Sequence, residues 1–374
     1  MIFKEIYEDV ENISNVKDQR TLVKRMVNHA LNRVFCYHDF PYYLGEGVIK
    51  TINDYSTGTV SITTDSATIT GSGTTWTSAM VGRKIRFNGK YPYYRIKTFT
   101  STTELILEQP VQETTDTAAT YIIYQDEYRL DADVDKYKLI RQAQNNRILL
   151  SLHPSRFDEA YPMPKSYSDP TMEIMSGTKL DTYSTGTLSG TVNTSVLTGS
   201  STVWTGVEGL GRMSRIRVGN NVYTVKSVDS NTQITIYEIL TASIAASTSY
   251  VIDLSNLVVQ VYQIPNAQRL LYYRKFRLPT PLVHDYDLPD MLSAWHWLLV
   301  YGALSMIFIQ KGDIQKSQNE AEQRFVAGLM DMKLKEGSFT PDRIYKRKSI
   351  DRIPNRTDRL DGLEPADFMR PYSG

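Results

Sequence analysis

The segment Thr70-Gly-Ser-Gly-Thr-Thr-Trp-Thr77 recurs in this chain as Thr198-Gly-Ser-Ser-Thr-Val-Trp-Thr205, with six of the eight residues identical. The sequence similarity extends on both sides of this segment, and each copy ends with an equivalent tyrosine, Tyr121 or Tyr250. Two copies are too few for a solenoid or a propeller, in which several neighbouring units share one core. We therefore expect one module, duplicated, whose two copies each fold largely by themselves.

Short segments of alternating apolar and polar residues, separated by Gly, Asn and Ser turns, surround both copies of the repeated segment. This pattern is typical of short β-strands. It predicts a first β module at 48–125 and a second at 183–254, joined by a strand and loop segment at 126–182.

The two ends of the chain show helical periodicity instead. Apolar residues at every third or fourth position predict amphipathic helices at 17–36 and 314–335. The uncharged segment 291–310 is long enough to cross a bilayer. Its polar residues, the helix-start sequence Asp287-Leu-Pro-Asp290 and the helix stop Lys311-Gly312 favour a central helix covered by the other two.

The predicted fold class is α+β. A helical bundle base is built from both chain ends, two duplicated small β-barrel or sandwich modules are inserted in it, and an extended arm follows. The predicted domains are the N-terminal helical region of the base at 1–47, β module 1 at 48–125, the connecting segment 126–182, β module 2 at 183–254, the strands and C-terminal helices of the base at 255–336, and the arm 337–374.

Composition excludes several classes of protein. The chain has 42 Lys and Arg against 41 Asp and Glu, a net charge of +1, which argues against a protein that coats a polyanion. Cys36 is the single cysteine, so no internal disulfide framework exists, and we expect it to be a small buried residue. The acidic N-terminus does not resemble a signal peptide, which predicts a protein used without secretion.

The sequence contains none of the common enzyme motifs for phosphate, dinucleotide, zinc-protease or hydrolase chemistry. We therefore predict no catalytic residue, no metal and no cofactor. The five histidines are scattered, and His296 is interpreted as a hydrogen-bonded core residue. The neighbouring acids Asp126-Glu127 and Asp158-Glu159 are interpreted as surface residues, because catalytic carboxylates face each other across a cleft.

Trp76 and Trp204 occupy equivalent positions in the two copies. Sugar-binding modules expose tryptophan in this way, but a buried ring that anchors a small β core explains the same repetition. We favour the core interpretation for both.

The segment 337–374 has no helical or strand periodicity, but it mixes cations with apolar residues. A disordered terminus is one interpretation. The apolar residues favour an extended arm that docks on a partner or on a neighbouring subunit, since only such contacts offset the entropy of ordering it. The predicted docking residues are Ile344, Tyr345, Lys346, Arg347, Lys348, Ile350, Ile353, Phe368 and Tyr372.

One stretch of the chain has a familiar order of motifs. Val261-Tyr-Gln-Ile-Pro265 is followed by Leu271-Tyr-Tyr-Arg-Lys275, then by Asp287-Leu-Pro-Asp290 and by the apolar run from Trp295 to Ala303. This succession resembles the head-to-tail adaptor, or connector, proteins of tailed bacteriophages, particularly the short-tailed type. The segment Ser155-Arg-Phe-Asp-Glu-Ala-Tyr-Pro162 is similar too. The chain departs from the family by carrying a second β module.

The resemblance implies a structural virion protein at the head–tail junction, assembled in the host cytoplasm without a membrane. It implies a homo-oligomeric ring, commonly a dodecamer, that docks on the portal protein and on tail or nozzle proteins and connects capsid to tail. Genomic DNA would pass through its channel during ejection without specific binding. Two alternatives stay open: a tail receptor or glycan-binding protein that uses the β modules, and a cell-wall hydrolase with carboxylates across a cleft.

Overall fold

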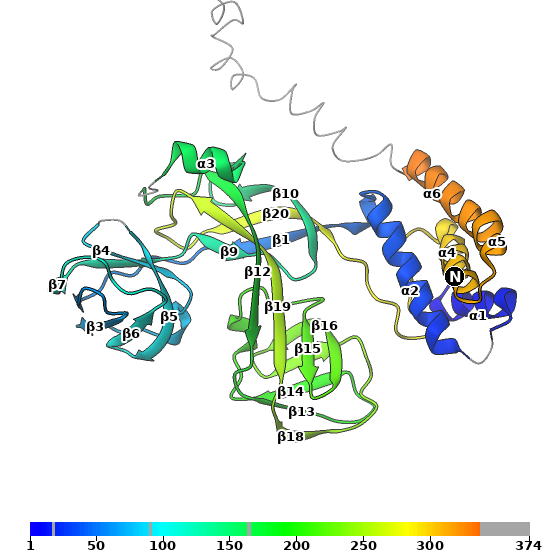
Figure 1. The fold of residues 1–374 in the computed structure, drawn as a ribbon, viewed down its shortest axis with the longest axis horizontal. Helices are drawn as coiled ribbons and strands as arrows, with labels where there is room; N and C mark the ends of the chain where they lie inside the picture. The colour runs from blue at the N-terminus through cyan, green and yellow to red at the C-terminus, as the bar shows by residue number, and fades with distance from the viewer. Residues whose placement is uncertain (17–18, 90–91, 163–165, 337–374) are drawn as a thin grey trace, which may run out of the picture. The chain divides into compact units, whose positions relative to one another are not determined.

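The computed structural model describes residues 1–16, 19–89, 92–162 and 166–336. The fold mixes helices with β-rich modules (Figure 1) and divides into two compact units. The helical unit contains Met1–Leu44 and the described residues from Leu278 onward, and the sheet unit contains Gly45–Arg277.

The helical unit is organised around α4, Trp297–Gln310, whose side chains are apolar on nearly every face. The longer helices that contact it are α1, Phe3–Ser14; α2, Arg20–Tyr37; and α6, Gln323–Glu336. Close packing requires Gly302 in α4, because a Cβ there would lie 2.9 Å from that of Ala30 and 2.8 Å from the Phe325 ring. The sequence predicted α2, α4 and α6 approximately, but it did not predict α1.

The predicted helix 291–310 begins later than expected. A 3-10 turn, η4 at Ser293–Trp295, precedes α4. His296, at the junction, is a hydrogen-bonded core residue as predicted, with Nδ1 2.8 Å from the carbonyl of Met1 and Nε2 3.1 Å from that of Met291. Of the helices among the described residues, none combines the length and hydropathy needed to cross a membrane.

Shorter elements complete the helical unit. The 3-10 turn η1, Pro41–Tyr43, follows α2, while α5, Ile314–Lys316, and the π-helical η5, Ser317–Glu322, lead into α6. The interpretation of Cys36 as buried is wrong, because its side chain is exposed. The buried stripe of α2 ends with Leu31 and Val34, and Cys36 lies off this stripe near the end of the helix.

The first β module is one seven-stranded sheet with the order β7-β2-β3-β6-β5-β4-β8. The 3-10 turn η2, Ser78–Met80, follows the repeated segment. The strands are β2, Thr59–Ile62; β3, Thr68–Ser72; β4, Lys84–Phe87; β5, Tyr94–Ser101; β6, Glu104–Leu107; β7, Asp116–Ala119; and β8, Tyr121–Tyr124.

The second β module has the order β18-β13-β14-β17-β16-β15-β19, so each strand corresponds to one strand of the first module. Its turn η3 is Trp204–Gly206. The strands are β13, Thr187–Gly190; β14, Val196–Ser200; β15, Arg215–Val218; β16, Asn221–Ser230; β17, Gln233–Ile236; β18, Ile244–Thr248; and β19, Val251–Tyr262.

The rest of the sheet unit comes from the segment between the modules and from the strands β1 and β20 that precede the first module and follow the second. Long antiparallel strands β12, Met172–Tyr183, and β19 form a ribbon that Figure 1 shows in green and yellow-green. The ribbon is extended by β9, Glu127–Arg129, and β11, Leu150–Leu152, with α3, Pro154–Ala160, beside it. A separate three-stranded sheet has the order β1-β20-β10, namely Leu44–Lys50, Leu270–Arg277 and Val134–Gln142.

This arrangement divides the expected domain 255–336. Residues 255–277 belong to the sheet unit, because β19 runs without a break from the second module into the central ribbon and β20 pairs beside β10. Only the residues from Leu278 onward join the helices.

Candidate functional site

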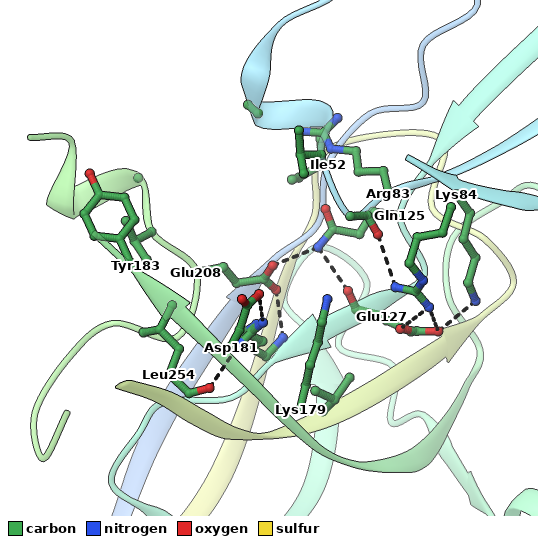
Figure 2. Close-up of a pocket in the computed structure, with 18 of the residues that line it drawn as sticks. Ile52, Arg83, Lys84, Gln125, Glu127, Lys179, Asp181, Tyr183, Glu208 and Leu254 are labelled. Carbon is green, nitrogen blue, oxygen red and sulfur yellow. Dashed lines mark hydrogen bonds and ion pairs between the residues drawn. The ribbon is translucent and has the colours of Figure 1, made fainter. Parts of the chain in front are cut away.

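A cleft of about 490 Å³ lies within the sheet unit and is the candidate functional site (Figure 2). Its walls are the turn at 78–83 and strands β4 and β5 of the first module, β9, the second half of β12, and the loop 206–208 of the second module. The cleft therefore borders both β modules and the central ribbon. Its lining is rich in charged side chains.

Lys84 is the centre of a buried ionic cluster on one wall. Its side chain is 5% exposed, and its Nζ lies 2.9 Å from both Asp126 Oδ2 and Glu127 Oε1. Arg95 adds a contact of 3.1 Å from Nη2 to Glu127 Oε2. Pairing of β4 with β8 places Lys84 opposite Tyr124, so the acids that follow β8 come within its reach.

The charges in this cluster stabilise one another. Burial disfavours the charged form of Lys84, but the carboxylates of Asp126 and Glu127 outweigh this effect and raise the pKa of Lys84 above the usual lysine value. Burial alone would raise the pKa of Glu127, yet the charges of Lys84 and Arg95 lower it. Both groups therefore stay ionised near neutral pH, which suits a structural ion pair better than proton transfer.

Glu208 connects the second module to the same wall. Its carboxylate accepts a hydrogen bond of 2.9 Å from Gln125 Nε2 and one of 2.7 Å from the backbone N–H of Arg129. Burial raises the pKa of Glu208, although these hydrogen bonds act in the opposite direction. The guanidinium of Arg129 also contacts Asp181 of β12 at 2.8 Å.

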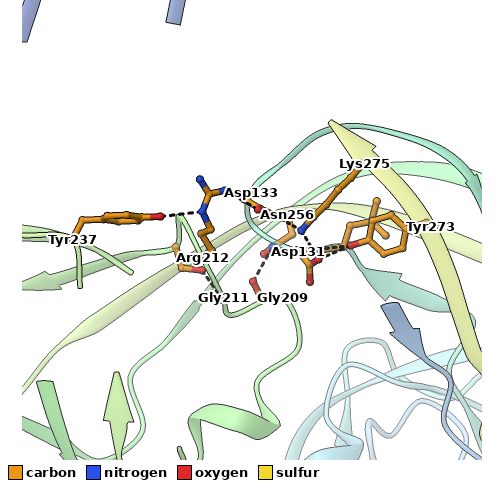
Figure 3. A network of polar contacts seen from close by, with 11 residues as sticks. Asp131, Asp133, Gly209, Gly211, Arg212, Tyr237, Asn256, Tyr273 and Lys275 are labelled. Carbon is orange, nitrogen blue, oxygen red and sulfur yellow. Dashed lines mark hydrogen bonds and ion pairs between the residues drawn. The ribbon is translucent and has the colours of Figure 1, made fainter. Parts of the chain in front are cut away.

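A second polar network holds the second module to the three-stranded sheet (Figure 3). Lys275 Nζ contacts Asp131 Oδ2 at 2.7 Å and Asp133 Oδ1 at 2.5 Å. The other oxygen of Asp133 lies 2.9 Å from Arg212 Nη1, and Arg212 Nε donates to the Tyr237 hydroxyl at 2.9 Å.

Asn256 adds a neutral contact to this network. Its Nδ2 donates to the carbonyls of Leu130 and Gly209, both at 2.9 Å. Gly209 must be glycine here, since it has a φ of +82° and a Cβ would lie 2.8 Å from the Asn256 amide oxygen. The network therefore fixes a loop of the second module against the segment that enters β10.

The cleft presents a surface whose acids are already bound by cations or amide donors. Within the described ranges, no group of three or more His, Cys, Asp or Glu side chains could hold a metal ion. These ion pairs and hydrogen bonds hold both β modules against the central ribbon.

The structure contradicts the surface interpretation of Asp126-Glu127. Asp126 is buried and Glu127 is half-buried, because both turn back toward Lys84. Asp158-Glu159 are exposed, as interpreted. Sequence reasoning also missed Glu208, since a single acid in a glycine-rich loop carries no pattern.

Trp76 and Trp204 lie in the cores of the two modules, each 1% exposed. Neither ring forms the flat exposed surface that the glycan-binding alternative requires. The predicted docking residues of the arm, from Ile344 to Tyr372, lie outside the described residues.

Comparison with known proteins supports a phage adaptor-type protein, a structural and non-enzymatic class found in the virion. The family model that matches is described as SU10 adaptor protein, and it covers residues 173–344, a little under half of the chain. This range contains the β12–β19 ribbon, the second module and the helices α4 and α6.

No curated protein sequence matches the chain. Among solved structures, one similar chain is the phage phi92 endosialidase, at 10% sequence identity and a TM-score of 0.14. The similarity covers 66% of this chain and 55% of the endosialidase chain, and at that TM-score it carries no argument.

Proposed function

We propose that the protein is a head-to-tail adaptor that forms a homo-oligomeric ring, a dodecamer, at the junction of capsid and tail. The ring docks on the portal protein, receives tail or nozzle proteins and leaves a channel through which DNA passes without specific binding. Assembly takes place in the host cytoplasm. The observation that carries this proposal is the match of residues 173–344 to the SU10 adaptor family.

Two further points of the architecture belong to the proposal. The helices from both chain ends form the base of the adaptor, and the β modules arose by duplication. The identical strand order of the modules and their equivalent buried tryptophans support the duplication. The ionic contacts of Lys84 and Arg212 support a role for the modules as fixed projections, because buried ion pairs hold one geometry.

The segment 337–374 completes the proposal as an arm that docks on the portal or on a neighbouring subunit. Its apolar and cationic residues supply the contacts that such docking needs.

Electron microscopy of the purified full-length protein, alone and mixed with portal protein, tests the function. The expected result is a ring in the presence of portal, with a central channel. A protein that stays monomeric and does not bind portal under any mixing ratio would overturn the proposal. Symmetry averaging of the same images decides whether the ring is a dodecamer.

A further inference from the structure

One edge of β12 has no strand beside it over half of its length. On one side β12 pairs with β19 from Met172 to Tyr183, while on the other side β11 covers only Met172–Ile174. A bulge interrupts the ladder between Met175 and Gly177, and the pairing with β19 is regular from Thr178 onward. Among the described strands, none pairs with the outer edge of Thr178–Tyr183.

The hydrogen bonds of β19 show which backbone groups point outward from β12. In an antiparallel ladder, successive residues direct their N–H and C=O groups to opposite sides. The N–H of Val261 donates to Asp126 and the carbonyl of Leu257 accepts from Leu130, both on the side away from β12. The even-numbered residues of β19 therefore face β12.

Their partners in β12 are Lys179, Asp181 and Tyr183, which direct their backbone groups inward to β19. It follows that Leu180 and its neighbours at 178 and 182 direct theirs to the open edge. The N–H of residue 182 is bonded there to the side chain of Asp181, at 2.9 Å, rather than to another strand.

Side-chain space is available on both faces of this edge. Lys179 and Tyr183 line the cleft on one face of the strand. Leu180 lines a second hollow, also of about 490 Å³, on the other face of the strand, together with Asp253 and Ser255 of β19. Side chains of a strand alternate between its two faces. A strand added at this edge would therefore place its own side chains alternately beside the cleft and beside the hollow.

We propose that the edge Thr178–Tyr183 is a docking site for an extended segment of a partner protein, which adds to the sheet as a further strand. Leu180, 78% exposed, offers an apolar contact on one face. Lys179, on the cleft face, forms no hydrogen bond or ion pair with the described residues, and its charge acts on the carboxylate of Glu208 in the same cleft. The segment that fits therefore alternates apolar and acidic side chains.

The local sequence agrees with a docking edge that is protected from uncontrolled pairing. A bulge and a lysine on an edge strand are features that limit aggregation of exposed edges. Here the bulge at Met175–Gly177 ends the regular edge and Lys179 lies within it. The regular stretch still offers the outward N–H groups of Thr178 and Leu180 and the outward carbonyls of Thr178, Leu180 and Thr182, enough to align a short peptide.

The test uses the full-length protein and a labelled short peptide that alternates valine and glutamate, with binding measured by fluorescence anisotropy. The matched variants are Leu180→Pro, which removes an outward N–H, and Leu180→Ala, which removes only the side chain. Proline is tolerated at an edge position whose N–H faces outward. We expect Leu180→Pro to bind roughly tenfold more weakly than Leu180→Ala, the effect of losing one backbone hydrogen bond.

Hydrogen exchange provides a second measurement that needs no variant. Bound peptide should slow exchange of the Leu180 amide in the wild-type protein, and the same peptide with N-methylated amides should not. The proposal is overturned if the peptide does not bind, or if proline and N-methylation have no effect. It is also overturned if the wild-type protein self-associates through this edge, because the occupant would then be a second copy. None of these outcomes depends on the adaptor function.

Discussion

The indole nitrogen of Trp76 donates a hydrogen bond to the hydroxyl of Tyr121, 3.1 Å away, inside the first β module. The second module repeats this contact between Trp204 and Tyr250 at 2.9 Å. Ring centroids are 5.9 Å apart in the first pair and 6.0 Å in the second, with nearly the same edge-to-face angle. The two modules thus share one core geometry.

Replacement of either tryptophan should therefore loosen only its own module. Trp76→Ala and Trp204→Ala should each cost about 3–5 kcal/mol locally, because a large buried ring leaves a cavity. Hydrogen exchange should rise in β2–β8 for the first variant and in β13–β18 for the second. Tyr121→Phe removes the acceptor of the indole N–H and the donor to the Thr57 carbonyl, and it should cost about 1–3 kcal/mol. Unchanged exchange in the altered module would refute the core assignment.

Removal of Lys84 should be strongly destabilising. Lys84→Ala leaves the carboxylates of Asp126 and Glu127 without their shared cation in a largely buried site, and breaking such a pair typically costs about 3–5 kcal/mol. Arg217→Ala is the matched control, since the Arg217–Asp253 pair is exposed and should contribute at most about 1 kcal/mol. Chemical unfolding measures both, and equal losses in the two variants would contradict the prediction.

Glu173 should make stability depend on pH. Its side chain is 2% exposed, and burial raises its pKa to about 7 from a usual value of 4.5, although hydrogen bonds with Tyr137 and Ser151 act against this. A raised folded-state pKa means that stability is fully present below pH 4.5 and is lost as pH rises to about 7, by about 3 kcal/mol in all.

Glu173→Gln should remove this slope and stabilise the protein above pH 7. Unfolding free energies measured between acidic and mildly alkaline pH test this, with the exposed Glu159→Gln as the control that keeps the wild-type slope. A wild-type slope that survives in Glu173→Gln would show that another group titrates.

The contact between α4 and α6 should not tolerate a methyl group at Gly328. A Cβ there would lie 2.3 Å from Leu298 Cδ2 and 2.4 Å from Trp297 Cη2. The higher helix propensity of alanine would stabilise the fold by about 1 kcal/mol. We expect the steric overlap to destabilise it by about 1–3 kcal/mol, which exceeds this gain. Thermal unfolding followed by circular dichroism should show a lower midpoint than for Gly211→Ala, where no atom lies within 4 Å.

Deletion of 338–374 should leave the folded units intact and prevent stable attachment to portal-bearing heads. Unfolding of the truncated protein and its occupancy on heads are the two measurements. Normal occupancy of the truncated protein would exclude the arm proposal while leaving the adaptor function open.

Local patterns in the sequence were sufficient to find the β modules and three of the helices. A repeated Trp and Tyr at matching spacing identifies equivalent cores, and apolar residues at helical spacing identify α2 and α6, because both signals depend on residues close together in sequence. The helix α1 was missed although Phe3, Ile6, Tyr7 and Val10 are buried at helical spacing, so the local pattern was present in the sequence.

Only the tertiary structure decided how the modules are held and what the ribbon exposes. Lys84 lies 42 positions from Asp126 and Gln125 lies 83 from Glu208, so no local pattern connects them. Whether an acid is solvated or buried depends on which strands pair around it. The open edge at Leu180 is likewise a property of the sheet order, because a strand has a free side only once its neighbours are placed.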